Sequence, residues 1–264
     1  MNGLNLKQFH ENQGLPANVY YFYLSESTLL SMKKVFTVCI LVFWGAFTIA
    51  QNSQLKILAI GDSNGEFDFG WVAQLQKIRL SDRIVNTAIS GNTTGFDNLN
   101  RKELNTLRNV NSYLNKGDTE LAGMDVILIM LGTNDCKAIF ADSLKQVPLN
   151  MERLILKIKQ HGVYRQYQPQ IFIVSPPPFG PPEMLIAKYK GGAKRIKYLQ
   201  KKFKKTARKE NCIFIDIYSE IKDTFKNITS DGIHLTPEGQ RQIAEIINLK
   251  VDKQMQKNGL FGGF

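Results

Sequence analysis

Cysteine and histidine are scarce in this chain of 264 residues, and each shortage narrows what the chain can do. Three cysteines, Cys39, Cys136 and Cys212, are too few for a disulfide framework, and no Cys-x-x-Cys pair occurs. A thiolate metal site is therefore not expected, and the sequence predicts no metal and no other cofactor. For Cys136 two interpretations stay open: a small packing residue, which we favour, or a reactive thiol.

Long apolar runs are also rare. One uncharged run, Val35 to Ala50, has sixteen residues, whereas a membrane span needs about twenty apolar residues. The run follows Met32-Lys33-Lys34 and precedes a polar segment, which is the layout of a secretory signal peptide with cleavage near Ala50. An uncleaved anchor is the alternative interpretation.

This layout divides the chain into three parts. Residues 32–50 are predicted to be the signal peptide and residues 51–264 the mature domain. Residues 1–31 are a doubtful N-terminal extension, because a signal peptide begins at the start of translation. We expect a secreted or periplasmic protein without a stable membrane span after processing.

Acidic residues are outnumbered, since 34 Lys and Arg face 23 Asp and Glu and the net charge is +11. Residues 188–209 alone hold eleven basic residues and no acidic one. Within them, apolar residues recur at three- and four-residue steps: Ile196, Leu199, Phe203 and Ala207. This spacing predicts an amphipathic helix with a solvated basic face. Attraction to anionic sugars, lipid headgroups or nucleic acid is the alternative, but no nucleic-acid partner is expected.

Short apolar runs alternate with longer helix-period segments, which predicts one α/β domain with a parallel sheet. The predicted strands are 56–60, 83–88, 125–131, 170–174 and 213–217. The predicted helices are 70–79, a stretch after Gly95, 144–160, 193–209 and 237–253. Thr236 and Pro237 are a typical N-cap and first-turn residue for the last helix. Residues 176–182, which are rich in proline, are expected to form an irregular loop.

Polar motifs follow three of the predicted strands, and a fourth precedes the last helix. They are Gly61-Asp62-Ser63-Asn64, Ser90-Gly91-Asn92-Thr93, Gly132-Thr133-Asn134-Asp135 and Asp231-Gly232-Ile233-His234. The carboxyl ends of parallel strands meet at one edge of an open α/β sheet, where such folds bind their ligands. We therefore expect the four motifs to converge at that edge.

Ser63 is the predicted nucleophile. It is expected at a strand-to-helix turn, where free backbone N–H groups favour developing negative charge. A plain Asp-Ser helix cap is the alternative. Gly61-x-Ser63-x-Gly65 also matches the nucleophile elbow of α/β-hydrolases. That interpretation is disfavoured because Ser63 ends the first strand and because Asp231 and His234 lie only three residues apart.

His234 is the predicted general base. Of the other histidines, His10 lies in the doubtful extension and His161 ends a predicted helix. Asp231, in a short loop with Gly232, can reach the far ring nitrogen of His234 and stabilise the imidazolium that forms during attack. A purely structural contact between Asp231 and His234 is the alternative.

Gly91 and Asn134 are the candidate oxyanion donors, together with the backbone N–H of Ser63. A glycine amide can approach a tetrahedral intermediate closely, and an asparagine side chain brings a neutral NH₂. Turn geometry and an Asx cap would explain the same residues without catalysis. Asp62 and Asp135 are expected to support the two loops.

Taken together, these motifs resemble the SGNH, or GDSL-type, hydrolase superfamily of esterases, lipases and thioesterases over nearly all of the predicted mature domain. The resemblance implies a flavodoxin-like three-layer sandwich, in which a five-stranded parallel sheet lies between helices. It also implies Ser63 as nucleophile, Asp231 and His234 as its partners, and Ser63, Gly91 and Asn134 as the oxyanion donors.

Finer details resemble the arylesterase and acyltransferase branch of that superfamily, which implies short acyl esters as substrates. These details are the segments 130–135, 174–178 and 231–234. Two residues depart from the usual pattern of the superfamily: Asn64 stands where leucine is common, and Asn92 follows Gly91. Both adjoin the expected substrate pocket.

The sequence thus predicts an exported serine esterase that acts through an acyl-enzyme on a small-molecule or carbohydrate ester. Its acyl pocket is expected beside Phe179, Pro181 and residues near Trp71. The alternatives are a lysophospholipase or thioesterase for longer acyl chains, and a non-catalytic carbohydrate-binding module on a hydrolase scaffold. The sequence does not determine the oligomeric state, or whether the enzyme transfers the acyl group to water or to another acceptor.

Overall fold

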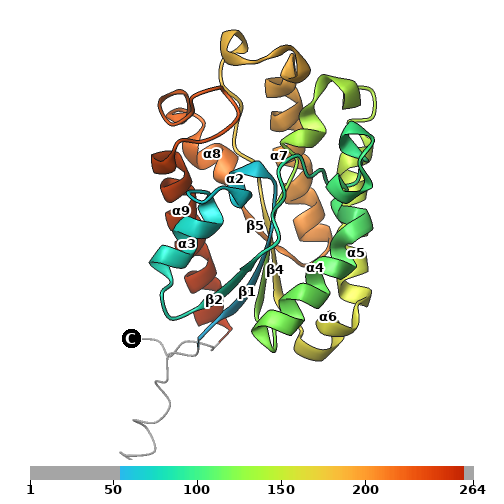
Figure 1. Cartoon of the computed structure of the whole chain (residues 1–264), viewed down its shortest axis with the longest axis vertical. Helices are drawn as coiled ribbons and strands as arrows, with labels where there is room; N and C mark the ends of the chain where they lie inside the picture. The colour runs from blue at the N-terminus through green and yellow to red at the C-terminus, as the bar shows by residue number, and fades with distance from the viewer. Residues whose placement is uncertain (1–53, 259–264) are drawn as a thin grey trace, which may run out of the picture. The chain divides into compact units, whose positions relative to one another are not determined.

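The computed structural model describes residues 54–258, and the predicted signal peptide and N-terminal extension lie outside them. The strands are β1 (Lys56–Ile60), β2 (Arg83–Asn86), β3 (Val126–Met130), β4 (Gln170–Val174) and β5 (Ile213–Ile215). They form one parallel sheet in the order β2-β1-β3-β4-β5 (Figure 1). This is the flavodoxin-like order, so the predicted α/β fold class is confirmed.

The central strand, β3, explains why the sheet is covered on both faces. Its sequence, Val-Ile-Leu-Ile-Met, is apolar throughout, and all five residues are buried. Side chains alternate between the two faces of a strand, so a strand without polar residues needs a helical layer on each side. Ile127 pairs in register with Leu58 of β1 and Ile171 of β4, which continues the apolar layer across the sheet.

Helices form the two outer layers. One face is covered by α3 (Trp71–Ile78) and α9 (Pro237–Lys257), and the other by α4 (Thr106–Leu121), α5 (Gln146–Gln160) and α7 (Gly192–Lys209) (Figure 1). Along β1, Ile57 and Ala59 belong to the apolar core beneath α3 and α9, whereas Leu58 and Ile60 belong to the core beneath α4, α5 and α7. Residues 54–258 therefore form a three-layer sandwich, as predicted.

The strands β2 and β5 end earlier than predicted. β2 ends at Asn86, because the side chain of Asn86 accepts a hydrogen bond from the N–H of Ala88 at 2.9 Å and turns the chain. β5 ends early because Asp216 caps the short helix α8 (Ile217–Ile221), accepting from the N–H of Ser219 at 3.2 Å. A further short helix, α6 (Gly162–Tyr167), follows α5 and was not predicted.

The helix expected after Gly95 begins only at Thr106. Leu99 and Asn100 have positive φ angles of 56° and 58°, which interrupts any regular helix in the preceding segment. Asn105 then caps α4, because its side-chain oxygen accepts a hydrogen bond from the N–H of Arg108 at 3.2 Å. The residues between β2 and α4 are thereby left as a loop at the carboxyl edge of the sheet.

The amphipathic pattern of α7 is confirmed. Ile196, Leu199 and Phe203 have no exposed surface and Ala207 has 1%, while the lysines between them are on the outer face. Thr236 caps α9 through its side chain, and Pro237 is the first helical residue, as predicted. Within residues 54–258, no helix has the length and apolar character that crossing a membrane requires.

Candidate active site

Ser63 occupies the turn between β1 and the short helix α2 (Ser63–Glu66). Asp62 is the N-cap residue, and its Oδ1 accepts a hydrogen bond from the N–H of Asn64 at 3.1 Å. Ser63 is therefore the first helical residue, whose N–H has no partner inside the helix. Ser63 is 7% exposed, so its hydroxyl lies near the surface but is largely enclosed.

The structure brings Ser63, Asp231 and His234 together in one chain of hydrogen bonds. His234 Nε2 lies 3.0 Å from Ser63 Oγ, although 171 positions separate the two residues. On the other side of the ring, His234 Nδ1 lies 2.6 Å from Asp231 Oδ2. With Nδ1 donating to the carboxylate, Nε2 is free to accept the serine proton, which is the geometry of a nucleophile activated by a base.

The loop that carries Asp231 and His234 is held by hydrogen bonds within itself. Asp231 Oδ1 accepts from the N–H groups of Ile233 and His234, at 2.8 and 2.7 Å. The Thr229 hydroxyl donates to the carbonyl of His234 at 2.7 Å. Gly232 has a φ of +78°, a value that suits glycine, so the tight turn between acid and base depends on it.

Asp231 is ionised under ordinary conditions. Partial burial raises the pKa of its carboxyl, but hydrogen bonds from the backbone and ring of His234 and from the N–H of Ile233 outweigh this, and the net pKa is below its ordinary value. A negative carboxylate beside Nδ1 favours the tautomer that leaves Nε2 facing Ser63.

The two backbone groups predicted to receive an oxyanion have no competing acceptor. Within residues 54–258, the N–H groups of Ser63 and Gly91 make no hydrogen bond. Gly91 has a φ of +93° and its carbonyl accepts from Asn98 Nδ2 at 2.6 Å. An added Cβ would lie 3.2 Å from the Leu104 side chain, so the loop requires glycine for its conformation as well as for access.

Asn134 follows β3 and joins the other loops. Its Nδ2 donates to the carbonyl of Asn92 at 3.0 Å, which leaves the second proton of the NH₂ group available. Its Oδ1 accepts from the hydroxyl of Tyr189 at 3.1 Å. Tyr189 thereby sets the orientation of the amide, and the sequence analysis missed it because the loop after β4 carries no recognisable signal at that position.

The two departures from the family pattern are structural ties between loops. Asn64 Oδ1 accepts from the N–H of Leu235 at 3.1 Å and from Gln240 Nε2 at 2.8 Å. Asn92 Nδ2 donates to the carbonyl of Gly61 at 3.1 Å. Neither asparagine has exposed surface. They therefore connect the turn of Ser63 to the histidine loop and to the loop of Gly91, rather than lining an open pocket.

The two carboxylates predicted to support the loops, Asp62 and Asp135, are buried. Both oxygens of Asp135 lie 3.0 Å from the N–H of Thr94, which fastens the loop after β2 to the loop after β3. Burial raises the pKa of Asp135 to about 7 and that of Asp62 to about 6, because a low-dielectric interior disfavours the charged form.

A buried cation, Lys137, also adjoins these loops and was not predicted. Its ammonium donates to Asn98 Oδ1 at 3.1 Å, and Asn98 in turn donates to the carbonyl of Gly91. Lys137 is only 7% exposed. Burial, together with the positive charge of Lys188, lowers its pKa. Through Asn98, this lysine supports the loop of Gly91 from within the protein.

Cys136 sits beside Asn134 but lacks the properties of a reactive thiol. It has no exposed surface, and burial raises its pKa well above the ordinary value. This supports the interpretation as a packing residue. Among the residues that the structure describes, no group of three or more His, Cys, Asp or Glu side chains could hold a metal ion.

The acyl pocket expected beside Phe179, Pro181 and residues near Trp71 stays a prediction. Trp71 has no exposed surface and belongs to the core under α9, so it does not itself line a pocket. Nearby, the Phe67 ring lies 5.5 Å from the ring of His234 and flanks the site. Phe179 packs edge-on against Tyr189 with ring centres 5.4 Å apart, and Pro181 is half-buried in the same loop.

Comparison with known proteins identifies the family. The model of the GDSL-like Lipase/Acylhydrolase family matches residues 58–242. Among curated proteins, no sequence matches this chain closely enough to be called a relative.

Several solved structures share the fold. A carbohydrate acetylesterase from Sinorhizobium meliloti is 24% identical with a TM-score of 0.61, over 76% of this chain and 100% of that one. An aryl esterase from M. smegmatis is 25% identical with a TM-score of 0.62, over 76% and 99%. A lipase/acylhydrolase from Enterococcus faecalis is 18% identical with a TM-score of 0.60, over 76% and 97%.

The family match covers more than half of the chain and includes the turn of Ser63, the loops of Gly91 and Asn134, and the histidine loop. This chain therefore belongs to the GDSL-like lipase/acylhydrolase family, and it is a serine hydrolase that acts on carboxylic ester bonds.

Proposed function

We propose that this protein is an exported esterase that hydrolyses short-chain acyl esters, with acetyl esters of carbohydrates and small aryl or alkyl esters as candidate substrates. The observation that carries the proposal is the 3.0 Å contact between Ser63 Oγ and His234 Nε2, with Asp231 on the far side of the ring. An uncharged serine is a weak nucleophile, and such a contact makes it a strong one.

In this mechanism Ser63 Oγ attacks the ester carbonyl while His234 Nε2 takes its proton. The oxyanion of the tetrahedral intermediate accepts hydrogen bonds from the N–H groups of Ser63 and Gly91 and from the Asn134 side chain. His234 then gives its proton to the leaving alcohol, and an acyl-enzyme remains on Ser63. Water, deprotonated by His234, attacks the acyl group, and the acid is released as Ser63 regains its proton.

Two further observations support the choice of substrate and location. The structural neighbours include a protein described as a carbohydrate acetylesterase and one described as an aryl esterase. Residues 32–50 have the layout of a signal peptide, which suits an enzyme that meets polysaccharides outside the cytoplasm. Asp62 and Asp135 hold the loops of the site through hydrogen bonds to the N–H groups of Asn64 and Thr94.

Hydrolysis of p-nitrophenyl esters from acetate to palmitate tests the reaction and the acyl length. We expect the highest kcat/KM at acetate or butyrate. A maximum at long chains would favour the lysophospholipase or thioesterase alternative. The complete absence of turnover, with binding to carbohydrate, would favour the non-catalytic binding module.

Matched variants test the roles of the two central residues. Ser63→Ala is expected to lower kcat by at least about a thousandfold, because the covalent route is lost, whereas Ser81→Ala, at an exposed serine, leaves it unchanged. His234→Asn should abolish turnover, while His161→Asn should not, since His161 only caps α6. Unchanged turnover in Ser63→Ala would exclude the mechanism.

Export has its own test. Expression of the full chain in a bacterium with fractionation and mass analysis should give a periplasmic or secreted protein that begins near Gln51. Recovery of the mature activity only in the cytoplasm, or of peptides from residues 1–31 in native protein, would contradict this part of the proposal.

A further inference from the structure

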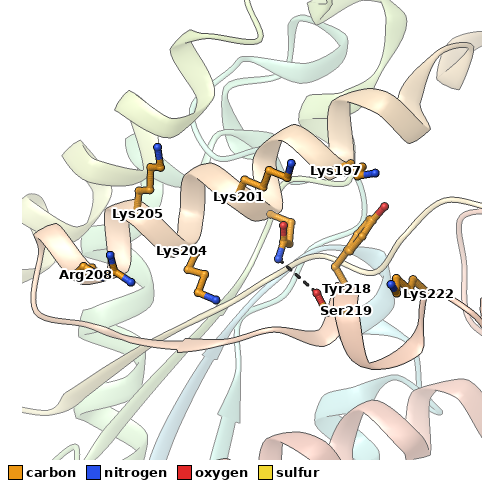
Figure 2. A pocket seen from close by; sticks show the side chains of 9 residues that line it. Lys197, Lys201, Lys204, Lys205, Arg208, Tyr218, Ser219 and Lys222 are labelled. Atoms are coloured by element: carbon orange, nitrogen blue, oxygen red, sulfur yellow. Dashed lines mark hydrogen bonds between the residues drawn. The ribbon is translucent and has the colours of Figure 1, made fainter.

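A groove separates α7 from the start of α8 (Figure 2). Its volume is about 500 Å³, and none of the side chains proposed for catalysis lines it. Six of the lining residues are basic: Lys197, Lys201, Lys204, Lys205, Arg208 and Lys222. The basic face of α7, which the sequence predicts to be a solvated helix surface, is therefore one wall of a concavity.

Most of the positive charge of this groove has no ion-pair partner among residues 54–258. Within residues 54–258, none of the five cations that α7 contributes has a carboxylate within ion-pair distance, although Lys209 on the same helix pairs with Glu152. Lys222 lies 4.0 Å from Asp223. Asp216 is a nearby negative charge, but its carboxylate accepts from Gln200 Nε2 at 2.8 Å and from the N–H of Ser219 and lies within ion-pair distance of none of these cations.

The cations form a line rather than a cluster. Lys197, Lys201, Lys204 and Arg208 follow one another at steps of four, three and four residues, so they share one face of α7. From the first to the last, this row extends roughly 16 Å along the helix axis. A row of like charges that faces a groove matches a linear polyanion better than a small anion, because several charges of the partner can be met at once.

A membrane surface is a poorer fit. Peripheral membrane sites combine basic residues with exposed apolar side chains that enter the lipid boundary. The large exposed apolar residues of the described chain, such as Leu80, Ile139 and Leu249, are not among those lining the groove. A concave wall would also hold part of the charge away from a flat bilayer.

Nucleic acid is also a poorer fit than a charged polysaccharide. Single-strand binding sites rely on several aromatic platforms, and phosphate recognition favours the planar guanidinium of arginine. This groove has one aromatic residue, Tyr218, and one arginine, Arg208, against five lysines. Tyr218 stands between the two walls, next to the Gln200 and Ser219 contact at 3.5 Å, where a ring and hydrogen-bonding groups can meet a sugar (Figure 2).

One end of the groove lies at the catalytic edge of the sheet. The start of α7 is tied to the loop of Asn134, because Arg195 Nε donates to the carbonyl of Cys136 at 2.9 Å. The start of α8 is tied to the carboxyl end of β4, because the N–H of Tyr218 donates to Ser175 Oγ at 2.8 Å. The strand that leads into α8, β5, lies three strand spacings, or roughly 14 Å, from β1, the strand that leads into the turn of Ser63.

We propose that this groove binds a linear anionic polysaccharide, and that such a chain carries the acyl groups removed at Ser63. The second half of this statement rests on the proposed esterase function. A sugar chain whose acyl group reaches Ser63 continues past the Asn134 loop into the groove, where lysines meet its carboxylates. The groove then selects the alcohol half of the ester, and the catalytic site selects the acyl half.

Binding is tested first, independently of turnover, with the full chain and unacetylated polygalacturonate, using neutral dextran as the comparison. We expect salt-sensitive binding of polygalacturonate only, weakened about tenfold in Lys197→Gln/Lys201→Gln/Lys204→Gln. Glutamine has a helix propensity similar to that of lysine, so these substitutions should leave α7 folded. The matched control, Lys77→Gln/Lys253→Gln/Lys257→Gln, removes three exposed charges from α3 and α9 and should bind as the unaltered chain does.

Kinetics test the link to the catalytic site. On acetylated polygalacturonate the groove variant should show a raised KM with nearly unchanged kcat, while its hydrolysis of p-nitrophenyl acetate stays the same. Absence of turnover of both esters by the unaltered chain would refute the esterase function. The binding experiment would still show whether the groove binds the polysaccharide.

Three outcomes would overturn the groove proposal. The first is no binding of polygalacturonate, or binding that the groove variant retains in full. The second is groove-dependent binding of phosphatidylglycerol vesicles without polygalacturonate binding, which would identify a membrane surface. The third is groove-dependent binding of single-stranded oligothymidylate alone, which would identify a nucleic-acid partner.

Discussion

Asn64 and Gln240 are joined by a buried hydrogen bond of 2.8 Å between Oδ1 and Nε2, across 176 positions of the sequence. The same Asn64 oxygen accepts from the N–H of Leu235, the residue after His234. Gln240 in turn accepts from the N–H of Trp71 through its own oxygen, at 3.1 Å. The turn of Ser63 and the loop of His234 are therefore held together by a pair of buried amide side chains.

Replacing Asn64 by leucine tests this link. Leu235 N–H and the Gln240 amide would lose a buried acceptor, so the free energy of unfolding should fall by about 1–3 kcal/mol. Because the histidine loop also shifts relative to Ser63, kcat should fall while KM changes little. Chemical denaturation and steady-state kinetics measure the two effects.

The second amide of the pair supplies the control. Gln240→Leu should reproduce the loss, whereas Gln242→Leu, on the same helix but half-exposed, should not. Lower stability with unchanged kcat in the folded Asn64→Leu protein would show that Asn64 supports the fold and does not position His234.

Tyr189 offers a test of the proposed oxyanion donor. In Tyr189→Phe the Asn134 side chain loses the hydroxyl that orients it, and we expect kcat to fall about fivefold with KM nearly unchanged. Tyr198→Phe is the control, since Tyr198 is a half-buried tyrosine on α7 outside the site. An equal effect of both variants would argue against an oriented Asn134 amide.

Gly91 should not tolerate a side chain. Gly91→Ala places a Cβ at a φ of +93° and 3.3 Å from Asn98 Nδ2, at a cost of roughly 1–2 kcal/mol in stability. Both Tm and kcat should therefore decrease. Gly162→Ala is the matched control, because a Cβ there meets no atom within 4 Å and alanine favours the helix. Full activity of Gly91→Ala would show that the site does not require glycine at this position.

Buried Asp135 makes stability depend on pH. Its pKa is about 7 in the fold against an ordinary 3.8, so between these values the folded state keeps a proton that the unfolded chain has released. Stability from this group is complete below about pH 4 and is lost as pH rises towards 7, by roughly 4 kcal/mol. Asp62, with a pKa of about 6, acts in the same direction.

Asp135→Asn removes this dependence while the amide oxygen can still accept from Thr94. The fall in Tm between pH 5 and pH 8 should be smaller in this variant than in the unaltered chain. Asp142→Asn, at an exposed position, should keep the original dependence. Parallel Tm curves for all three proteins would contradict the burial of an ionisable group at Asp135.

Much of the fold was predictable because its signals are local. Apolar runs marked all five strands, and three- and four-residue spacing marked α7 with its buried Ile196 and Phe203. The boundaries failed where single polar side chains turned the chain, at Asn86 and Asp216. Asn105, which delays α4, acts in the same way.

The motifs of the site were visible for a similar reason, since Asp231 and His234 lie three residues apart and glycines mark the turns. The supporting side chains were not. Tyr189 reaches Asn134 across 55 positions, and Lys137 reaches Asn98 across 39. Export of the protein stays a prediction from residues 32–50.

Composition and local pattern were thus sufficient to predict the class of fold, a candidate nucleophile and the chemistry of acyl transfer, because caps, turns and apolar periodicity are encoded by near neighbours. Two features were decided only by the tertiary structure. They are the residues that hold the site in place and the groove that the basic face of α7 lines. Hydrogen bonds and concave surfaces between distant segments depend on how strands and helices pack, and no short stretch of residues records that packing.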